Sequence, residues 1–401
     1  PACMHQFQKL SMNAEEIESA DPSHEEPVEG MKSDEFASKG KKIYSYTIES
    51  TQNFVKDLKF SPDGTCLLSS LDDTTLQLFE TTLSNAEVEW NPCLSFSEGE
   101  VVYDIDWFPF MSSFDPSTCC FISASKDHPL HLWCAYTGKL RASYLGFDHL
   151  DEIAPTLSVS FNSLGTHIWG GHARGCLRRW DVTRPGKECE VRSPACKGKR
   201  KGNGQAGLLS KISFDPTYSG MFAIGSYSQT IFLYDERTDS GASDGVIGEL
   251  RTEKHKMGGV TCLRWHPNGQ IIYSGGRKSV EILAWDTRNT NEVITTFGRL
   301  SETNQRMAFD VDSRGRVLAT GGSDCSIKLF DAESGDDLFA FGDYADVVGG
   351  VSFCPNSKRI AVGTGQRHFD VEYEDLSEGS EKPRNSIDVL DFERKVEMTG
   401  E

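Results

Sequence analysis

The chain is organised by a unit of alternating apolar and polar positions that returns seven times. Each unit has an apolar stretch, a turn, a second apolar stretch ending in small residues, and a third stretch closing with a dipeptide, most often an aromatic residue and Asp. The segment MAFDVDSRGRVLATGGSDCSIKLFD (307–331) shows a whole unit. Alternation punctuated by Pro, Asp, Asn and Gly predicts short β-strands joined by tight turns.

Two markers of the unit recur in the same order along the chain. The first turns are FSPDG (60–64), WFP (107–109), FNSLG (161–165), FDP (214–216), WHPNG (265–269), VDSRG (311–315) and FCPNS (353–357). The closing pairs are FE (79–80), WC (133–134), WD (180–181), YD (234–235), WD (285–286), FD (330–331) and LD (390–391). The period slightly exceeds the roughly 40–45 residues of a WD-repeat blade, and an unrelated β-sandwich would not repeat both markers in order. We therefore predict an all-β fold, a seven-bladed WD-repeat β-propeller.

The same pattern sets the bounds of the predicted propeller at residues 41–397. An orphan strand, KKIYSYTI (41–48), precedes the first unit, and we expect it to pair with blade 7 and close the ring, because an open blade edge would otherwise be exposed. Residues 1–40 form an acidic tail with few aromatic residues, which predicts disorder. Two insertions interrupt the repeats: a basic one at 192–206 and an acidic one at 370–385.

The hydrogen-bonded His–Ser–Asp–Trp network that stiffens many WD-repeat blades is poorly represented. Blade 5 has His255, Ser274 and Trp285, but Lys278 stands in the turn region where an Asp is expected. We therefore predict that packing, rather than polar networks, holds most blades together.

Charge is spread unevenly over the 401 residues, which carry a formal net charge of −19. Residues 1–36 hold nine acidic and two basic residues, and residues 370–401 hold eleven acidic and four basic ones. The stretch between them is nearly balanced. The overall sign therefore does not exclude a nucleic-acid partner, because binding depends on where the basic residues lie.

The cysteines and the missing motifs exclude several classes of protein. None of the 12 cysteines forms a Cys-x-x-Cys pair, so we expect no metal site and a reducing compartment. No apolar run is long enough to cross a membrane, and PACMHQFQKL is not a secretory signal, although a start at Pro1 suggests a fragment. The nucleophile-elbow, phosphate-loop and zinc-protease motifs are missing. We therefore expect no enzyme activity, no cofactor and no membrane partner.

One face of the predicted propeller collects basic and aromatic residues. The loops that lead into each blade and those between second and third strands share this face, and they carry Lys126, His128, His172, Arg174, Arg277, Lys278, Arg306, Arg367 and His368, with Phe54, Tyr103 and Tyr227 on or near it. Cations that hold phosphates and rings that stack on bases suit single-stranded RNA. Each cation alone could be a solvated surface charge, and Phe54 and Tyr103 could equally be core residues; convergence of five blades favours binding.

A separate basic cluster lies in the 192–206 insertion. The sequence KGKRK places Lys197, Lys199, Arg200 and Lys201 together among glycines. Such a cluster is typical of a nuclear-localisation signal or a phosphate-contacting loop, and it is also compatible with an ordinary solvated loop.

Several segments resemble the telomerase Cajal body protein family over about residues 50–397. They are NFVKDLKFSPDG (53–64), VVYDIDWFPFMSS (101–113), SASKDHPLHLWCAYTGKLRASY (123–144), CEVR (189–192), GGRKSVEILAWDTR (275–288), TNQRMAFDVDSRG (303–315) and GTGQR (363–367). The family's glycine- and acid-rich C-terminal tail is shortened or missing in this chain.

The resemblance implies a seven-bladed propeller that binds box H/ACA small nuclear RNAs, including telomerase RNA where present, and directs their ribonucleoproteins to Cajal bodies. It also implies H/ACA and telomerase ribonucleoprotein components as partners, folding by the cytosolic chaperonin, and a location in the nucleus and Cajal body with some protein in the cytoplasm. It favours Arg277, Lys278 and Arg306 as RNA contacts. A second hypothesis, a protein scaffold that binds acidic or phosphorylated peptides, would use the same cations.

Overall fold

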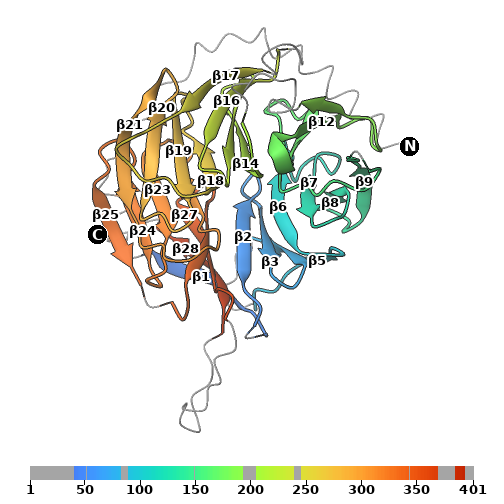
Figure 1. Cartoon of the computed structure of the whole chain (residues 1–401). Helices are drawn as coiled ribbons and strands as arrows, with labels where there is room; N and C mark the ends of the chain where they lie inside the picture. Colours follow the sequence, from blue (N-terminus) through green and yellow to red (C-terminus); the bar gives the residue numbers. More distant parts are fainter. Residues whose placement is uncertain are drawn as a thin grey trace, which may run out of the picture.

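The computed structural model describes residues 40–392 apart from 51, 83–88, 149, 193–204, 239–244, 343 and 369–383. Within these ranges the strands form seven antiparallel sheets of four strands each, which confirms the predicted seven-bladed propeller. Figure 1 shows the sheets arranged in a ring. The described residues contain no α-helix and one short 3-10 helix, η3 (Ala173–Gly175).

The four strands of each blade occupy equivalent positions from the channel outward. The innermost strands are β2 (Val55–Phe60), β6 (Val102–Trp107), β10 (Ser158–Phe161), β14 (Leu209–Phe214), β18 (Val260–Trp265), β22 (Phe309–Val311) and β26 (Val348–Phe353). The second strands are β3 (Cys66–Leu71), β7 (Cys120–Ser125), β11 (His167–Gly171), β15 (Met221–Ser226), β19 (Ile271–Gly276), β23 (Val317–Gly321) and β27 (Arg359–Thr364). The third strands are β4 (Thr75–Glu80), β8 (Leu130–Cys134), β12 (Leu177–Asp181), β16 (Ile231–Asp235), β20 (Glu281–Asp286), β24 (Ile327–Asp331) and β28 (Ser386–Asp391). The outer strands are β5 (Leu94–Ser97), β9 (Leu140–Tyr144), β13 (Glu190–Arg192), β17 (Val246–Leu250), β21 (Asn289–Gly298), β25 (Asp337–Phe341) and β1 (Lys41–Thr47).

The ring closes through β1, as the sequence predicted. This strand pairs antiparallel with β28, from the opposite end of the described chain, and completes the sheet of blade 7 (Figure 1). Two polar contacts fix the pairing: Ser45 donates to the buried Asp388 at 2.6 Å, and Lys42 forms an ion pair with the same carboxylate at 2.7 Å. The Tyr44 ring stacks on Trp90 with centroids 5.1 Å apart, which ties the closing strand to blade 1.

Hydrogen bonds between the innermost strands join neighbouring blades around the channel. Side chains bond the main chain of the next blade: Asp104 to Val159 (3.1 Å), Asp106 to Phe161 (3.0 Å), Ser158 to Leu209 (3.1 Å), Ser210 to Val260, Asp310 to Phe353 (2.9 Å) and Ser352 to Phe60 (3.2 Å). Lys59 donates to the carbonyl of Ile105, and Arg264 forms an ion pair with Asp310 at 3.1 Å. Polar side chains of the channel therefore link all seven interfaces while apolar clusters fill the space between the sheets.

The two faces of the ring differ in the segments that they carry. We call the loop face the side that carries the loops leading into the innermost strands and the loops between second and third strands. We call the turn face the other side, which carries the Pro- and Gly-rich turns that follow the innermost strands. Gly64 and Gly315 adopt left-handed φ values of 69° and 73° in these turns, a conformation that glycine reaches at little cost.

Three residues counted in the predicted insertions are buried parts of the propeller. Arg192 ends β13 and is 2 % exposed, Gln205 is 1 % exposed and donates to the Ile224 carbonyl, and Asn385 is 3 % exposed. The insertions are therefore shorter than predicted at these ends. Most of both insertions, the acidic tail over 1–39 and residues 393–397 lie outside the described residues.

Polar networks inside the blades also differ from the prediction. In blade 5, Trp285 donates to Ser274 at 2.8 Å, but His255 contacts Glu281 at 3.0 Å instead of joining them. Blade 2 holds a network that the sequence analysis missed, because Glu98 takes the place of the expected acceptor. This buried carboxylate accepts from His131 at 2.8 Å, from Trp133 at 2.9 Å, and from Ser123 and Ser125.

Candidate nucleic-acid interface

Basic and aromatic side chains gather where the channel opens on the loop face. We define the loop-face mouth by Lys56, Tyr103, Tyr227, Arg277 and Arg306. Arg306 donates to the carbonyl of Tyr103 at 3.2 Å, and the Arg277 guanidinium lies 3.8 Å from the Tyr227 ring centre. Burial raises the pKa of the Tyr103 phenol, and the nearby Asp127 and Tyr227 raise it further. Residues from four blades and one interblade loop therefore meet at one opening.

β-Bulges set the positions of Lys56 and Tyr103. The register of β2 against β3 shifts between Val55 and Asp57, and that of β6 against β7 shifts between Val102 and Asp104. A bulge adds an unpaired residue and redirects its side chain. Lys56 and Tyr103 are those extra residues, and both are half-buried. Strict strand alternation does not determine where either side chain points.

Arg277 and Tyr227 form the part of the mouth best suited to a nucleotide base. The Arg277 side chain comes from the loop between β19 and β20, and its Nε is buried without a hydrogen-bond partner among the described residues. A guanidinium at 3.8 Å from a ring centre makes a close cation–π contact. Within the described ranges no acidic side chain pairs with Arg277, so none of these residues neutralises its charge. The pair offers a flat, cationic surface of the kind on which bases stack.

Arg306 has a different role from the predicted one. Its side chain is 17 % exposed, and its terminal nitrogens donate to Asp57 at 3.0 Å, to Asp104 at 3.4 Å and to the Tyr103 carbonyl. Burial lowers the pKa of Arg306, but Asp104 and Asp57 outweigh it and raise that pKa above its usual value. The group is a structural cation that joins blades 1 and 2 to the loop before blade 6, so it is not free to hold a phosphate.

Lys56 is the residue of the mouth that sequence reasoning missed. Its Nζ donates to the carbonyl of Val102 at 3.0 Å and lies 3.8 Å from Asp72. Burial is the main reason that the pKa of Lys56 falls to about 8. Asp72 works against this shift, and the positive charges of Arg306 and Arg367 add to it. The ammonium is thus held near its titration point, where an added anion would favour its charged form.

Arg367, predicted as an RNA contact, is paired within the protein. Its side chain is 58 % exposed, but it donates to both carboxylate oxygens of Asp72, at 2.8 and 3.1 Å. The neighbouring His368 contacts Asp346 at 2.6 Å. The pair Arg367–Asp72 lies beside Lys56 and lowers the positive charge available at this side of the mouth.

The remaining predicted cations lie in other loops of the loop face or, for Lys278, next to a residue of the mouth. Lys126, Arg174 and Lys278 are exposed, and among the described residues the ion pairs of these three are limited to a 3.9 Å contact between Lys126 and Asp127. Lys278 follows Arg277 directly and has a left-handed φ of 49°. These three side chains can reach a ligand that extends from the mouth across the face.

Two of the predicted ring-bearing residues are buried. Phe54 is 4 % exposed, so its ring is a core side chain and offers no stacking surface; this prediction was wrong. His172 is 3 % exposed, and burial lowers its pKa to about 3, so it is a neutral structural residue that contacts the Pro155 carbonyl at 2.9 Å. The KGKRK cluster with Lys197, Lys199, Arg200 and Lys201 lies outside the described residues.

The arrangement places cationic side chains where they can bind an anion. In the described part of the chain, no cluster of three or more His, Cys, Asp or Glu side chains could hold a metal ion. None of the helical segments among these residues has the length and hydropathy that a membrane-spanning helix needs.

Comparison with known proteins relates the chain to WD-repeat proteins. Residues 40–80, 248–282 and 301–331 match the family described as "WD domain, G-beta repeat". The chain is 34 % identical over 343 residues to "Telomerase Cajal body protein 1" of Homo sapiens, which covers 82 % of this chain and 60 % of the relative. Its counterpart in Mesocricetus auratus is 34 % identical over 354 residues, covering 85 % and 63 %. The predicted resemblance is therefore confirmed.

A relative with a different name matches at lower identity. "Guanine nucleotide-binding protein negative regulator 1" of Schizosaccharomyces pombe is 28 % identical over 340 residues, covering 81 % of this chain and 83 % of that protein. The chain spans about three fifths of the length of the first relatives.

Proposed function

We propose that this WD-repeat propeller, homologous over most of its length to Telomerase Cajal body protein 1, binds box H/ACA small nuclear RNA on its loop face. In this proposal a single-stranded loop of the RNA enters the loop-face mouth. One unstacked base lies on the Arg277–Tyr227 pair, a second contacts Tyr103, and Lys56 and Lys278 hold phosphates. The observation that carries the proposal is Arg277, which lies against an aromatic ring and has no acidic partner in the described part of the chain.

Charge and shape both favour RNA over a purely peptide ligand at this mouth. Sequence-specific proteins usually recognise RNA in single-stranded loops, where bases stack on aromatic rings and Arg planes. The exposed Lys126, Arg174 and Lys278 lie around the same face and can follow a phosphate backbone. A phosphorylated peptide, the second hypothesis, would need one compact anion site, whereas these cations are spread over three blades.

The same proposal includes four further points. The RNAs include telomerase RNA where this is present, the partners are H/ACA and telomerase ribonucleoprotein components, the protein delivers these particles to Cajal bodies in the nucleus, and its role is non-enzymatic. They rest on the names of the relatives and on the binding face. Folding by a chaperonin is supported by the fold itself, because the closing strand joins residues 343 positions apart. Contacts so distant in sequence slow folding and leave strand edges exposed meanwhile.

The test compares RNA binding by three proteins. A box H/ACA small nuclear RNA, with and without its terminal loop, is titrated against wild type, the double variant Arg277→Gln/Lys278→Gln, and Arg288→Gln as control. Arg288 is in the same blade as Arg277 but on the turn face, with its side chain 68 % exposed. We expect loop-dependent binding that the double variant weakens and the control retains.

Salt dependence adds a second readout to the same titration. Three to five phosphate contacts give a slope of log K against log salt of about −2 to −4, at roughly 0.7 per contact for single strands. The double variant should flatten this slope by about 1 to 1.5. Tyr103→Ala should instead cost roughly 1–3 kcal/mol with little change of slope, if the ring stacks on a base. Equal binding by wild type and the double variant at every salt concentration would remove this face from consideration.

A further inference from the structure

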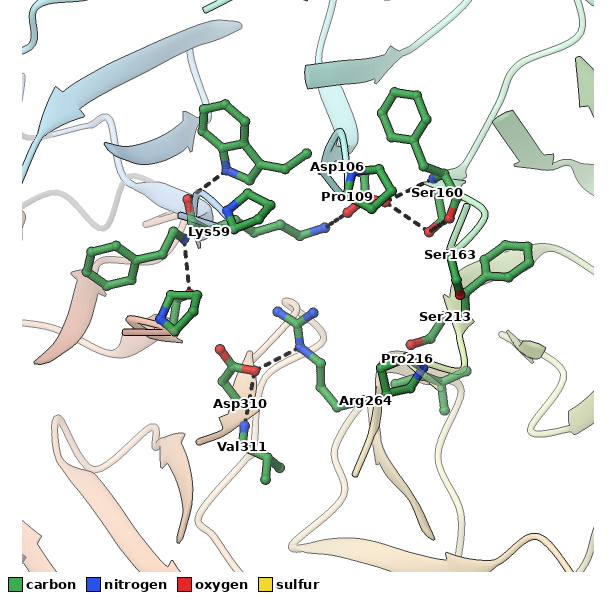
Figure 2. A pocket seen from close by; sticks show the side chains of 18 of the residues that line it. Lys59, Asp106, Pro109, Ser160, Ser163, Ser213, Pro216, Arg264, Asp310 and Val311 are labelled. Carbon is green, nitrogen blue, oxygen red and sulfur yellow. Dashed lines mark hydrogen bonds and ion pairs between the residues drawn. The ribbon is translucent and has the colours of Figure 1, made fainter. Parts of the chain in front are cut away.

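The channel also opens on the turn face, into a cavity of about 490 Å³ that all seven blades line. We define the turn-face mouth by this cavity. Its wall carries the charged side chains of Lys59, Asp106, Lys211, Arg264 and Asp310. Figure 2 shows Lys59, Asp106, Arg264 and Asp310 among prolines and serines. The volume is typical of a site for a small ligand or a few peptide side chains.

Four of the five charged side chains form ion pairs and hydrogen bonds within the protein that leave them unavailable to a ligand. Asp106 accepts from Lys59 at 3.0 Å through one oxygen and from Ser160 and the Phe161 amide through the other. Asp310 accepts from the amides of Val311 and Phe353 and pairs with Arg264. Lys211 pairs at 2.7 Å with the fully buried Asp104.

Arg264 is the group that remains available. Its Nε lies 3.1 Å from Asp310, while its two terminal nitrogens donate to no described residue. The side chain is 31 % exposed, and Figure 2 shows the guanidinium end pointing toward the middle of the ring. Asp310 raises the pKa of Arg264, so the fork is charged at any physiological pH. Such a fork matches a carboxylate with two parallel hydrogen bonds.

An apolar rim borders the same cavity. Pro62, Pro109, Pro216 and Pro355 line the cavity, and the rings of Phe110 and Tyr218 stack at 6.4 Å with an interplanar angle of 2°. Phe110 is 38 % exposed and Tyr218 59 %, although one belongs to blade 2 and the other to blade 4. Leu164, 42 % exposed, belongs to the turn of the blade between them. Exposed aromatic and apolar side chains around a polar centre are typical of interaction surfaces.

We propose that the turn-face mouth binds an acidic peptide segment of a partner protein, with one Asp or Glu carboxylate on Arg264 and apolar neighbours on the Phe110–Tyr218 rim. A phosphate fits less well, because the lining has a surplus of only one positive charge and a phosphomonoester carries about −1.5 to −2. RNA would need a track of cations, whereas the surrounding turns carry Asp63, Asp215 and Asp312. The site is distinct from the loop-face mouth and does not depend on RNA binding there.

The probe for this site is a fluorescein-labelled octapeptide with a single Glu flanked by Leu residues, and the same octapeptide with Gln in place of that Glu is its neutral match. Wild-type full chain should bind the acidic peptide at least tenfold more tightly than the neutral one. Arg264→Gln should weaken binding of the acidic peptide at least tenfold, and Arg288→Gln, an exposed arginine on the same face, should leave it unchanged.

Tyr218→Asn provides a second variant in case Arg264→Gln disturbs the fold. Tyr218 has a left-handed φ of 60°, which Asn tolerates, so the turn should persist while the aromatic rim is lost. Binding should fall about three- to tenfold. Wild-type affinity in both variants would overturn the proposal.

Two further experiments test the other possible ligands of the turn-face mouth, which are RNA and the chain's own acidic segment. A twelve-nucleotide single-stranded uridine RNA should not displace the peptide; displacement abolished by Arg264→Gln would assign the mouth to RNA and overturn the proposal. In a full-length variant with the nine acidic residues of 1–36 changed to their amides, peptide affinity should stay within threefold of wild type. A gain of tenfold or more would show that the chain's own acidic segment fills the mouth, which also overturns it.

Discussion

Lys56 and Lys59 lie three residues apart on β2, yet they stand at opposite mouths of the channel in opposite electrostatic settings. Lys56, at the loop face, has its pKa lowered to about 8 by burial, with one carboxylate at 3.8 Å. Lys59, at the turn face, is also buried, but Asp106, Asp104 and Asp57 outweigh that burial and raise its pKa. The same residue type is therefore an under-compensated cation at one mouth and a neutralised structural cation at the other.

The difference shows how one ring can carry two kinds of surface. At the turn face, the acids of one blade pair with a cation of the preceding blade and accept from an amide of the next. The terminal nitrogens of Arg264 donate to none of the described residues. At the loop face, Arg306 pairs with Asp57 and Asp104. The positive charges of Arg277 and Lys56 are therefore less well compensated by these carboxylates. The first mouth suits a single carboxylate, and the second suits a polyanion.

The largest expected effect comes from removing the strand that holds both mouths in one ring. Deletion of 41–47 exposes the edge of β28 and leaves Asp388 without Lys42 and Ser45. A loss of roughly 5 kcal/mol would lower Tm by about 10–20 °C, at about 2–4 °C per kcal/mol. Thermal unfolding followed by circular dichroism measures it. Deletion of 1–39 is the control and should change Tm by less than about 2 °C; equal Tm values for both deletions would disprove closure by β1.

Next in size is the effect of Arg306→Ala, which separates structural from ligand-binding cations at the loop-face mouth. The variant leaves the carboxylates of Asp57 and Asp104 buried without this partner, which should cost about 3–5 kcal/mol of folding free energy. Arg367→Ala, which removes a 58 % exposed arginine, should cost about 1 kcal/mol or less. Urea unfolding of both variants measures the difference. If Arg306→Ala is as stable as Arg367→Ala, the structural role assigned to Arg306 is wrong.

A smaller effect concerns pH and distinguishes Lys56 from Lys59. With its pKa near 8, Lys56 loses its proton as pH rises from 7 to 9, so a phosphate contact worth about 1 kcal/mol would be lost, roughly a fivefold drop in RNA affinity. Lys56→Arg keeps the charge throughout and should flatten the profile. Anisotropy titrations at several pH values measure it, and an identical pH profile in wild type and variant would exclude Lys56 as a phosphate contact.

Sequence reasoning reached the blades and their closure because both depend on local patterns. Turn residues, strand alternation and the orphan strand at 41–48 can each be recognised from a short stretch of sequence. Lys56 and Tyr103 were harder, since a bulge redirects them and alternation does not reveal a bulge. Lys56 could have been suspected from the unusual density of charge in VKDLK.

The loop-face cations could not be ranked from sequence for a different reason. Arg306 and Arg277 look alike in their loops, but the acid that neutralises Arg306 is 249 residues away along the chain. Pairing at that distance is a property of the closed ring. Phe54 was misassigned similarly, because only packing distinguishes a ring at the start of a strand that is buried from one that is exposed.

Photocrosslinking tests most directly the claim that RNA binds at the loop-face mouth. A box H/ACA small nuclear RNA is irradiated in complex with the full chain, and mass spectrometry identifies the crosslinked residues. The account predicts crosslinks at Tyr103 and Tyr227 that the Arg277→Gln/Lys278→Gln variant greatly reduces, and none at Phe110 or Tyr218, whose rings are more than one-third exposed on the turn face. Crosslinks concentrated at Phe110 and Tyr218, with none at Tyr103 or Tyr227, would contradict it.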